Sequence, residues 1–215
     1  MDSKNLKEIK VPESKHYFLS VWGLQKALLK EYTKIEELPK YPLNLDIKEN
    51  QNLLKDFISR VVEELAEAYE QAIIKKDFAL FYEELADALH FIVEVMIFSA
   101  PLMDFVGPHM VDILAVNAKS PKGYVKSKDI NNVHLALWMW DVTYYLNLAR
   151  NTLRNKPWKQ TEVRTRKNQF ISLISKSFAV LIYGMVNVVG LSAREIFVEY
   201  YKKNQINQFR IKSKY

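Results

Sequence analysis

The chain has 215 residues, of which 49% are hydrophobic, and it contains 5 glycines, 7 prolines and no cysteine. This length and composition predict one folded domain over residues 1–215, and they exclude a disordered chain, a disulfide framework and thiolate chemistry. The formal net charge is +6, and its basic residues gather in 150–167 and in the C-terminal tail. Solvated segments, or a surface that steers an anionic substrate, are the ordinary explanations, and stable nucleic-acid binding is not expected.

The ends of the chain and its most apolar segment bear on where the protein resides. Residues 1–15 are too polar for a signal peptide, and we expect residues 1–13 and 211–215 to be flexible ends. The longest apolar run, 170–191, contains Lys176 and Asn187, which favours a buried core helix over a membrane span. We therefore expect a cytoplasmic protein that does not enter a membrane.

The first two predicted helices are separated by prolines. Apolar residues recur every three or four positions over residues 14–38, and Pro39 follows directly. Asp46 and Glu49 have the spacing of a capping box, which predicts that the next helix begins there and runs to about Lys76.

A third helix is predicted from Phe78 to about Ser99, with Asp77 as its N-cap and Pro101 after its end. Residues 100–128 are less regular. A short helix over 109–118 and a turn at 120–123 are predicted within them.

The remaining chain is also helical in pattern. Helices are predicted over 130–152 and 164–189, and Ser192 with Glu195 forms a second capping box that opens a final helix through about Asn204. Strand-like alternation is nearly absent. The sequence therefore predicts an all-α helical bundle in a single domain, built around an antiparallel helix pair.

That helix pair carries four acidic residues in a symmetric arrangement. Glu64 and Glu67 lie three residues apart on one helix, and Glu84 and Asp87 lie three apart on the next. Residues at this spacing are neighbours on a helix surface. Both pairs are equally distant from the turn at residues 75–76, so antiparallel helices would bring all four carboxylates to one height.

Four like charges in a half-buried cluster repel one another unless a cation neutralises them. Mg²⁺ is the best match, because it prefers a few carboxylates together with water and substrate phosphates. Two ordinary acidic helix faces are the alternative explanation. Glu63 is rotated by about 100° from Glu64 and is expected to be exposed or peripheral, whereas His90, three residues after Asp87, is either a hydrogen-bond partner of the metal ligands or a core histidine.

Polar residues of the last helix form a second group. Lys203, Asn207 and Arg210 share one helical face, with Asn204 beside them. Cations and amides on one face suit phosphate and sugar oxygens, although a polar terminal helix with basic residues near its C-terminus has the same composition. Gln25, polar beside the apolar stripe of the first helix, is a candidate for reading a base edge.

These groups occur in the same order in the all-α nucleoside triphosphate pyrophosphohydrolases, and the chain resembles their dimeric, all-helical dUTPase branch, which is related to the MazG-type enzymes. The more specific pieces are the segments LADALHF and KNxxNxxR. The resemblance extends from about residue 20 to 210, with residues 100–190 matching only in helical character. The matching segments are Gln25-x-x-Leu28, Glu64-x-x-Glu67, Glu84-x-x-Asp87 with Leu89-His90-Phe91, and Tyr200 with Lys203-Asn204-x-x-Asn207-x-x-Arg210.

The resemblance implies hydrolysis of dUTP to dUMP and pyrophosphate by a homodimer. Two or more Mg²⁺ ions would be bound, and Mn²⁺ would be able to substitute for them. The implied metal ligands are Glu64, Glu67, Glu84 and Asp87, and Glu64 or Glu67 would activate water. The implied substrate ligands are Lys203, Asn204, Asn207 and Arg210 for phosphate and sugar, and Gln25 for the uracil edge.

Two departures from the family pattern concern the base. Relatives often have a glutamine where this chain has Ile211, and an aromatic residue soon after the first acidic motif, where this chain has Lys75-Lys76-Asp77-Phe78. A dCTPase or a broad dNTP pyrophosphohydrolase on the same scaffold therefore remains an alternative, and a non-catalytic helical binding protein is a second. Aromatic residues in HLALWMWDVTYYL, 134–146, would supply a dimer surface or belong to the core.

Overall fold

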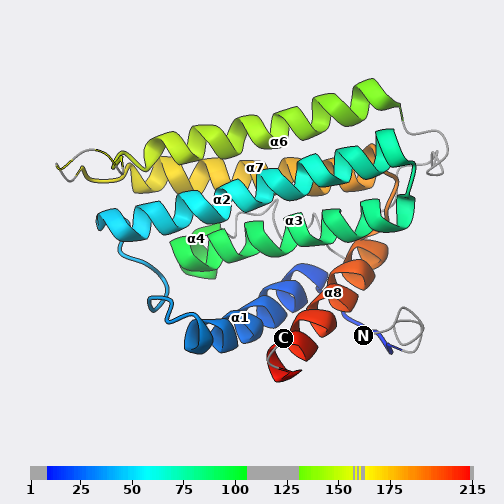
Figure 1. Ribbon diagram of the computed structural model, residues 1–215, viewed down its shortest axis with the longest axis horizontal. Helices are drawn as coiled ribbons and strands as arrows, with labels where there is room; N and C mark the ends of the chain where they lie inside the picture. Colours follow the sequence, from blue (N-terminus) through cyan, green and yellow to red (C-terminus); the bar gives the residue numbers. More distant parts are fainter. Residues whose placement is uncertain (1–8, 106–130, 157, 159, 161–162, 214–215) are drawn as a thin grey trace.

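The computed structural model describes residues 9–105, 131–156, 158, 160 and 163–213 (Figure 1). These residues form helices and contain no strand, which confirms the predicted all-α fold. The predicted helix over 109–118 and the turn at 120–123 lie outside them. The helices are α1 (Tyr17–Ile35), α2 (Lys48–Tyr69), α3 (Phe78–Ser99), α4 (Leu102–Phe105), α6 (Asn132–Thr152), α7 (Lys167–Asn187) and α8 (Ala193–Ser213).

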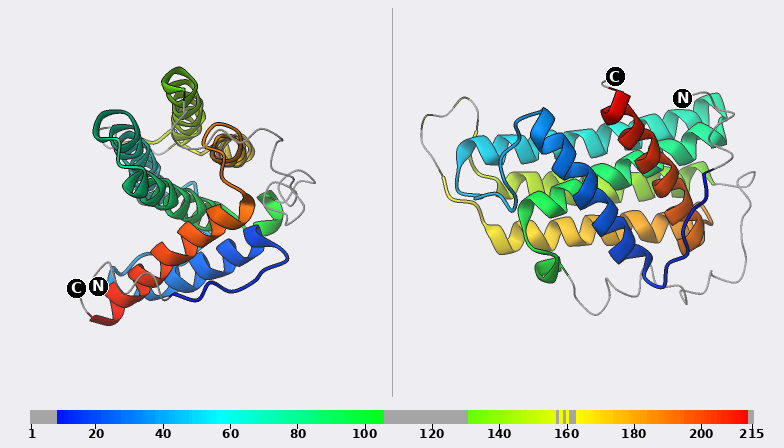
Figure 2. Two further views of the ribbon diagram at one scale, coloured as in Figure 1. Left: turned by 90° about the vertical axis from the view of Figure 1, so that its right-hand side faces the viewer. Right: turned by 90° about the horizontal axis from the view of Figure 1, so that it is seen from below.

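Two helical hairpins, α2–α3 and α6–α7, run along the length of the molecule, and α1 and α8 lie side by side across α3 (Figures 1 and 2). Helix α3 is central, because it contacts α2, α7, α8 and α1. Its sequence explains this position. From Phe81 to Ser99 its side chains are buried on nearly every face, as expected for a core helix.

The turn between α2 and α3 falls where the sequence predicts it. Helix α2 passes into a π-helical turn, Glu70–Lys75, and Lys76 adopts a left-handed conformation with φ of 58°. The Asp77 carboxylate then accepts hydrogen bonds from the backbone N–H groups of Ala79 and Leu80, both at 3.1 Å. The predicted N-cap is confirmed, and α3 folds back antiparallel to α2.

One of the two predicted capping boxes is wrong. Helix α2 begins at Lys48, and its N-cap residue Ile47 makes no side-chain cap. The Asp46 carboxylate instead accepts a hydrogen bond from the Thr165 N–H at 3.1 Å, because the segment that precedes α7 lies alongside and competes for it.

The capping box of α8 is confirmed, since the Ser192 N–H donates to the Glu195 carboxylate at 2.8 Å and the Glu195 N–H donates to the Ser192 hydroxyl at 3.2 Å. Helix α8 continues to Ser213, well past the predicted end at Asn204. Residues 211–213, predicted to be flexible, are therefore helical. No glycine or proline interrupts this segment.

Helices α6 and α7 meet at a close contact. The Trp138 indole N–H donates to the carbonyl oxygen of Val180 at 2.9 Å, and a Cβ atom at Gly184 would overlap this indole. Helix α7 is long and apolar enough to cross a membrane, but half of its apolar window is buried inside the bundle. Core helices commonly satisfy that criterion, and the packing against α6 fits a core helix.

Candidate metal and substrate site

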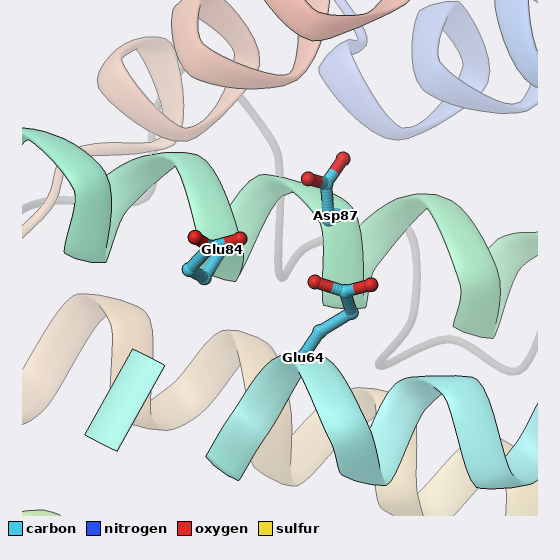
Figure 3. Close-up of side chains that lie close together, drawn as sticks. All are labelled: Glu64, Glu84 and Asp87. Atoms are coloured by element: carbon cyan, nitrogen blue, oxygen red, sulfur yellow. The ribbon is translucent and has the colours of Figure 1, made fainter. Parts of the chain in front are cut away.

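Three carboxylates from α2 and α3 lie close together. Glu64 projects from α2, and Glu84 and Asp87 project from α3 (Figure 3). One oxygen atom of each lies within 4.8 Å of the others, and all three side chains are half-buried. The predicted meeting of acids from both helices is therefore present in the fold.

The packing of the two helices explains this convergence. Ala68 of α2 and Ala88 of α3 are fully buried, and small side chains allow two helix backbones to approach closely. Leu65 and Leu85 are buried beside them. Each is adjacent in sequence to an acid of the group, so the apolar contacts fix the rotation of both helices and leave Glu64 and Glu84 at the border of the interface.

Glu67, predicted as the fourth ligand, lies outside this group of three. Its side chain is exposed, as is that of Glu63, which matches the expectation for Glu63. The Glu67 carboxylate is still close enough that its charge raises the pKa values of Glu64 and Glu84. It therefore borders the three converging acids from the solvent side.

The three acids resist ionisation. Burial, followed by the charges of Asp87, Glu67 and Glu84, raises the pKa of Glu64 to about 8. Burial and the charge of Asp87 also raise the pKa of Glu84. Burial raises the pKa of Asp87 as well, although a nearby ammonium group opposes this. A divalent cation would remove this repulsion.

The ammonium group belongs to Lys203 of α8. Its Nζ atom lies 2.5 Å from Oδ2 of Asp87 and 2.8 Å from Oε1 of Glu83. Burial opposes the positive charge, but the two carboxylates outweigh it and raise the pKa of Lys203. Sequence reasoning missed Glu83. Its position one helical turn before Asp87 is the signal that could have found it.

A pocket of about 260 Å³ opens beside these groups, between α1, α2, α3 and α8. Of the predicted phosphate and sugar ligands, Lys203, Asn207 and Arg210 line it. Asn204 does not, because its side chain is fully buried and its Oδ1 accepts a hydrogen bond from Gln208 at 2.9 Å. Apolar and aromatic side chains complete one wall, namely Leu28, Leu29, Tyr32, Leu38, Phe57 and Phe91.

A buried hydrogen-bond chain lies at the inner end of the pocket. The Tyr200 hydroxyl donates to Oε1 of Gln25 at 2.5 Å, and Nε2 of Gln25 donates to Oε1 of Glu94 at 2.8 Å. Gln25 has no exposed surface, whereas 6% of Glu94 is exposed. Glu94, which sequence reasoning missed, is therefore the more accessible end of this chain, and burial raises its pKa to about 8.

His90 is a core residue next to the site. Its ring stacks on Tyr200 with the ring centroids 4.1 Å apart, and Nε2 lies 3.2 Å from the Tyr200 carbonyl oxygen. Burial lowers the pKa of His90 to about 3, so the ring is neutral. It therefore links α3 to α8, and its hydrogen bond goes to a backbone carbonyl rather than to a carboxylate of the group.

The donor set suits a hard divalent cation. Three carboxylate oxygens within 4.8 Å of one another are near enough for small side-chain rotations to bring them to the Mg–O distance of about 2.1 Å around one ion. The ligands also come from two rigid, packed helices, and the cluster lacks the nitrogen and sulfur donors that zinc prefers. Glu64, Glu84 and Asp87 could hold a metal ion in this arrangement.

Comparison of the chain with protein-family models, with curated protein sequences and with solved structures found no match.

Proposed function

We propose that the protein is a Mg²⁺-dependent pyrophosphohydrolase that cleaves dUTP to dUMP and pyrophosphate. The observation that carries this proposal is that a group of three carboxylates lies directly beside Lys203 of α8, at a pocket that Arg210 and apolar side chains also line. Acids of this kind hold the metal that a polyphosphate requires, and cations neutralise the remaining phosphate charge. The choice of dUTP follows the family resemblance of the acidic and α8 motifs.

In this proposal each group has a defined task. Mg²⁺ held by Glu64, Glu84 and Asp87 would neutralise phosphate oxygens and lower the pKa of water. Lys203 and Arg210 hold the phosphates, and Asn207 contacts the sugar or a phosphate. Water forms a new P–O bond as the phosphoanhydride P–O bond breaks, and its proton passes to the exposed Glu67 or to Glu64 on the way to solvent.

The inner end of the pocket would receive the base. Glu94 is the polar group best placed to meet it, with Gln25 holding the carboxyl from behind. A neutral carboxyl presents one donor and one acceptor, which matches the N3 and O4 positions of uracil.

The same carboxyl also pairs with the amino group of cytosine. Glu94 is therefore the observation that favours dCTP as a second candidate substrate. A preference for dCTP would leave the proposed phosphate chemistry unchanged.

The test is a substrate panel with pyrophosphate release as the readout. The purified protein with Mg²⁺ should release pyrophosphate from dUTP at least tenfold faster than from dTTP, and a chelator should abolish release. Glu64→Gln should remove activity, whereas Glu63→Gln is the matched control, since this neighbouring acid points to solvent. Turnover that survives both the chelator and Glu64→Gln would refute the proposal.

A further inference from the structure

A second polar pocket, of about 510 Å³, is lined by residues of α2, of the last turns of α6 and of the segment after α6. Three cationic side chains line it: Lys55 of α2, Arg150 in the last turn of α6, and Lys156 of the segment after α6. Asn52, Ser59, Asn147 and Asn151 contribute polar groups. The proposed catalytic chemistry uses none of these residues.

Lys55 is an unusual member of this group, because only 7% of its surface is exposed. Buried lysines ordinarily have an acidic partner, but among the described residues neither Lys55, Arg150 nor Lys156 forms an ion pair. Within the described part of the chain, the ammonium of Lys55 donates to the carbonyl oxygen of Asn155. Burial and the charges of Lys156 and Arg150 lower the pKa of Lys55 to about 8, so the three cations are close enough to repel one another.

The acidic side chain among the described lining residues already has a partner. Asp56 lines the pocket, but its carboxylate lies 3.1 Å from the Arg60 guanidinium, which lines the first pocket. The C-terminal dipole of α6 also favours cations here, but it is equivalent to about half an elementary negative charge. The three cationic side chains carry a larger, opposite charge.

A buried hydrogen-bond network holds Asn155 and residues 163–165, which flank the basic residues after α6, in place. The Gln51 amide donates to the carbonyl oxygens of Leu45 and Val163, at 2.8 and 3.1 Å, and its oxygen accepts from the Asn155 N–H at 2.8 Å. Thr165 bonds to Leu45 and to Asp46 in the same network. Asn155 and residues 163–165 are thus held against α2 and the residues just before it, which positions the neighbouring Lys156 in advance of binding.

Two further features indicate the chemistry of the ligand. Trp158, at the edge of the pocket, is 77% exposed and offers an indole face for stacking. Asn52, Ser59, Asn147 and Asn151 supply amide and hydroxyl groups to the lining, and such groups hydrogen-bond to ligand hydroxyls. The volume is that of a small-molecule site. Phosphate, hydroxyl and planar ring together describe a nucleotide.

We propose that this pocket between α2 and α6 is a second binding site, which takes a mononucleotide with its phosphate against Lys55, Arg150 and Lys156 and its base against Trp158. The site does not depend on the proposed hydrolysis. It is separated from the first pocket by α2, with the Asp56–Arg60 ion pair between the two.

The test is calorimetric titration of the full chain with adenosine 5′-monophosphate and, separately, with inorganic phosphate, in the presence of a chelator. The Arg150→Gln, Lys156→Gln double variant should weaken adenosine monophosphate binding at least tenfold. Trp158→Ala should weaken the nucleotide severalfold and leave inorganic phosphate unaffected. The matched control removes two exposed lysines outside both pockets, Lys10→Gln with Lys15→Gln, and should bind as the wild type does.

Arg210→Gln distinguishes the two pockets. It should retain adenosine monophosphate binding, because Arg210 lines only the first pocket. Three results would overturn the proposal: no saturable binding, binding lost in Arg210→Gln but retained in the Arg150, Lys156 variant, or equal loss in the lysine control. Binding of a single-stranded oligonucleotide through the same residues, without binding of the mononucleotide, would replace it with a nucleic-acid surface.

Discussion

The ammonium of Lys203 lies 2.5 Å from a carboxylate oxygen of Asp87, one of the three acids that could hold a metal. A lysine from α8 thus supplies positive charge to a cluster formed by α2 and α3. In the proposed function this side chain turns toward the phosphates of the substrate once a cation neutralises the acids. Lys203 and the metal ion then compete for Asp87 but cooperate in holding the substrate.

Lys203→Gln should therefore separate metal binding from turnover. Loss of the competing ammonium should leave Mn²⁺ affinity unchanged or tighter, whereas loss of a phosphate contact should lower kcat/KM for dUTP at least tenfold. Calorimetry and pyrophosphate release measure the two effects. Lys202→Gln is the control, because that lysine pairs with Glu199 at 2.8 Å and lies outside the pocket. Weaker Mn²⁺ binding with normal turnover would contradict this division of roles.

Glu94 should make stability depend on pH. Its pKa is about 8 in the folded chain against an ordinary value of 4.5, so between these pH values the folded state holds a proton that the unfolded state has lost. Glu94 therefore does not lower the free energy of unfolding below pH 4.5. As pH rises from 4.5 toward 8, the free energy of unfolding falls by at most about 1.4 kcal/mol per pH unit.

Glu94→Gln removes this titration. The free energy of unfolding is measured with urea in the presence of a chelator. The difference in this free energy between wild type and Glu94→Gln should shift in favour of the variant from pH 5 to pH 8. Comparing the two proteins cancels the pH dependence that Glu64 contributes to both. A difference that stays constant with pH would show that Glu94 is ionised in the fold.

Two helical glycines, Gly184 in the α6–α7 contact and Gly23 in α1, should respond to alanine substitution in opposite directions. A Cβ at Gly184 would overlap the Trp138 indole, so Gly184→Ala should destabilise the fold by about 1–3 kcal/mol through overpacking. Gly23 also lies within a helix, but a Cβ there meets nothing within 4 Å. Gly23→Ala should therefore stabilise the chain by up to about 1 kcal/mol. Thermal or urea unfolding measures both, and equal effects would contradict the packing described.

The outer face of α6 predicts self-association. Val133, Leu137, Trp140 and Tyr144 follow one another at helical spacing and are 63, 56, 63 and 46% exposed, and an apolar stripe of this kind is typical of an interface. Trp140→Glu should convert a dimer to a monomer in sedimentation equilibrium. Leu19→Glu, an equally drastic change at an exposed position on α1, should not. A wild-type chain that is monomeric at high concentration would contradict the expected homodimer.

The helices could be predicted because their signals are local. Asp77 is an N-cap by its own side chain, and Ser192 with Glu195 closes a box within four residues, so both survive in the fold. Asp46 fails for a non-local reason. Thr165, distant in sequence, takes the carboxylate that the local pattern assigns to a cap.

The residues of the candidate site also fall into those that local sequence could predict and those that it could not. The spacing of Glu64, Glu84 and Asp87 about a turn is a local symmetry, and the fold brings these acids together. Glu94 and the burial of Gln25 could not be predicted, because both depend on α1, α3 and α8 meeting. Likewise, the sequence of 134–146 offers a core and a surface equally. Only the packing of the helices places Trp138 in the core and Trp140 on the surface.

Whether the three carboxylates bind one cation is tested most directly by titrating the chain with Mn²⁺. Binding is monitored by calorimetry and by the electron paramagnetic resonance signal of the free ion. The wild type and Glu63→Gln should bind Mn²⁺ saturably, with Mg²⁺ competing, and Glu64→Gln, Glu84→Gln and Asp87→Asn should each weaken binding at least tenfold. Wild-type protein that leaves the free Mn²⁺ signal unchanged, or acid variants that bind as tightly as Glu63→Gln, would contradict a metal site at these residues.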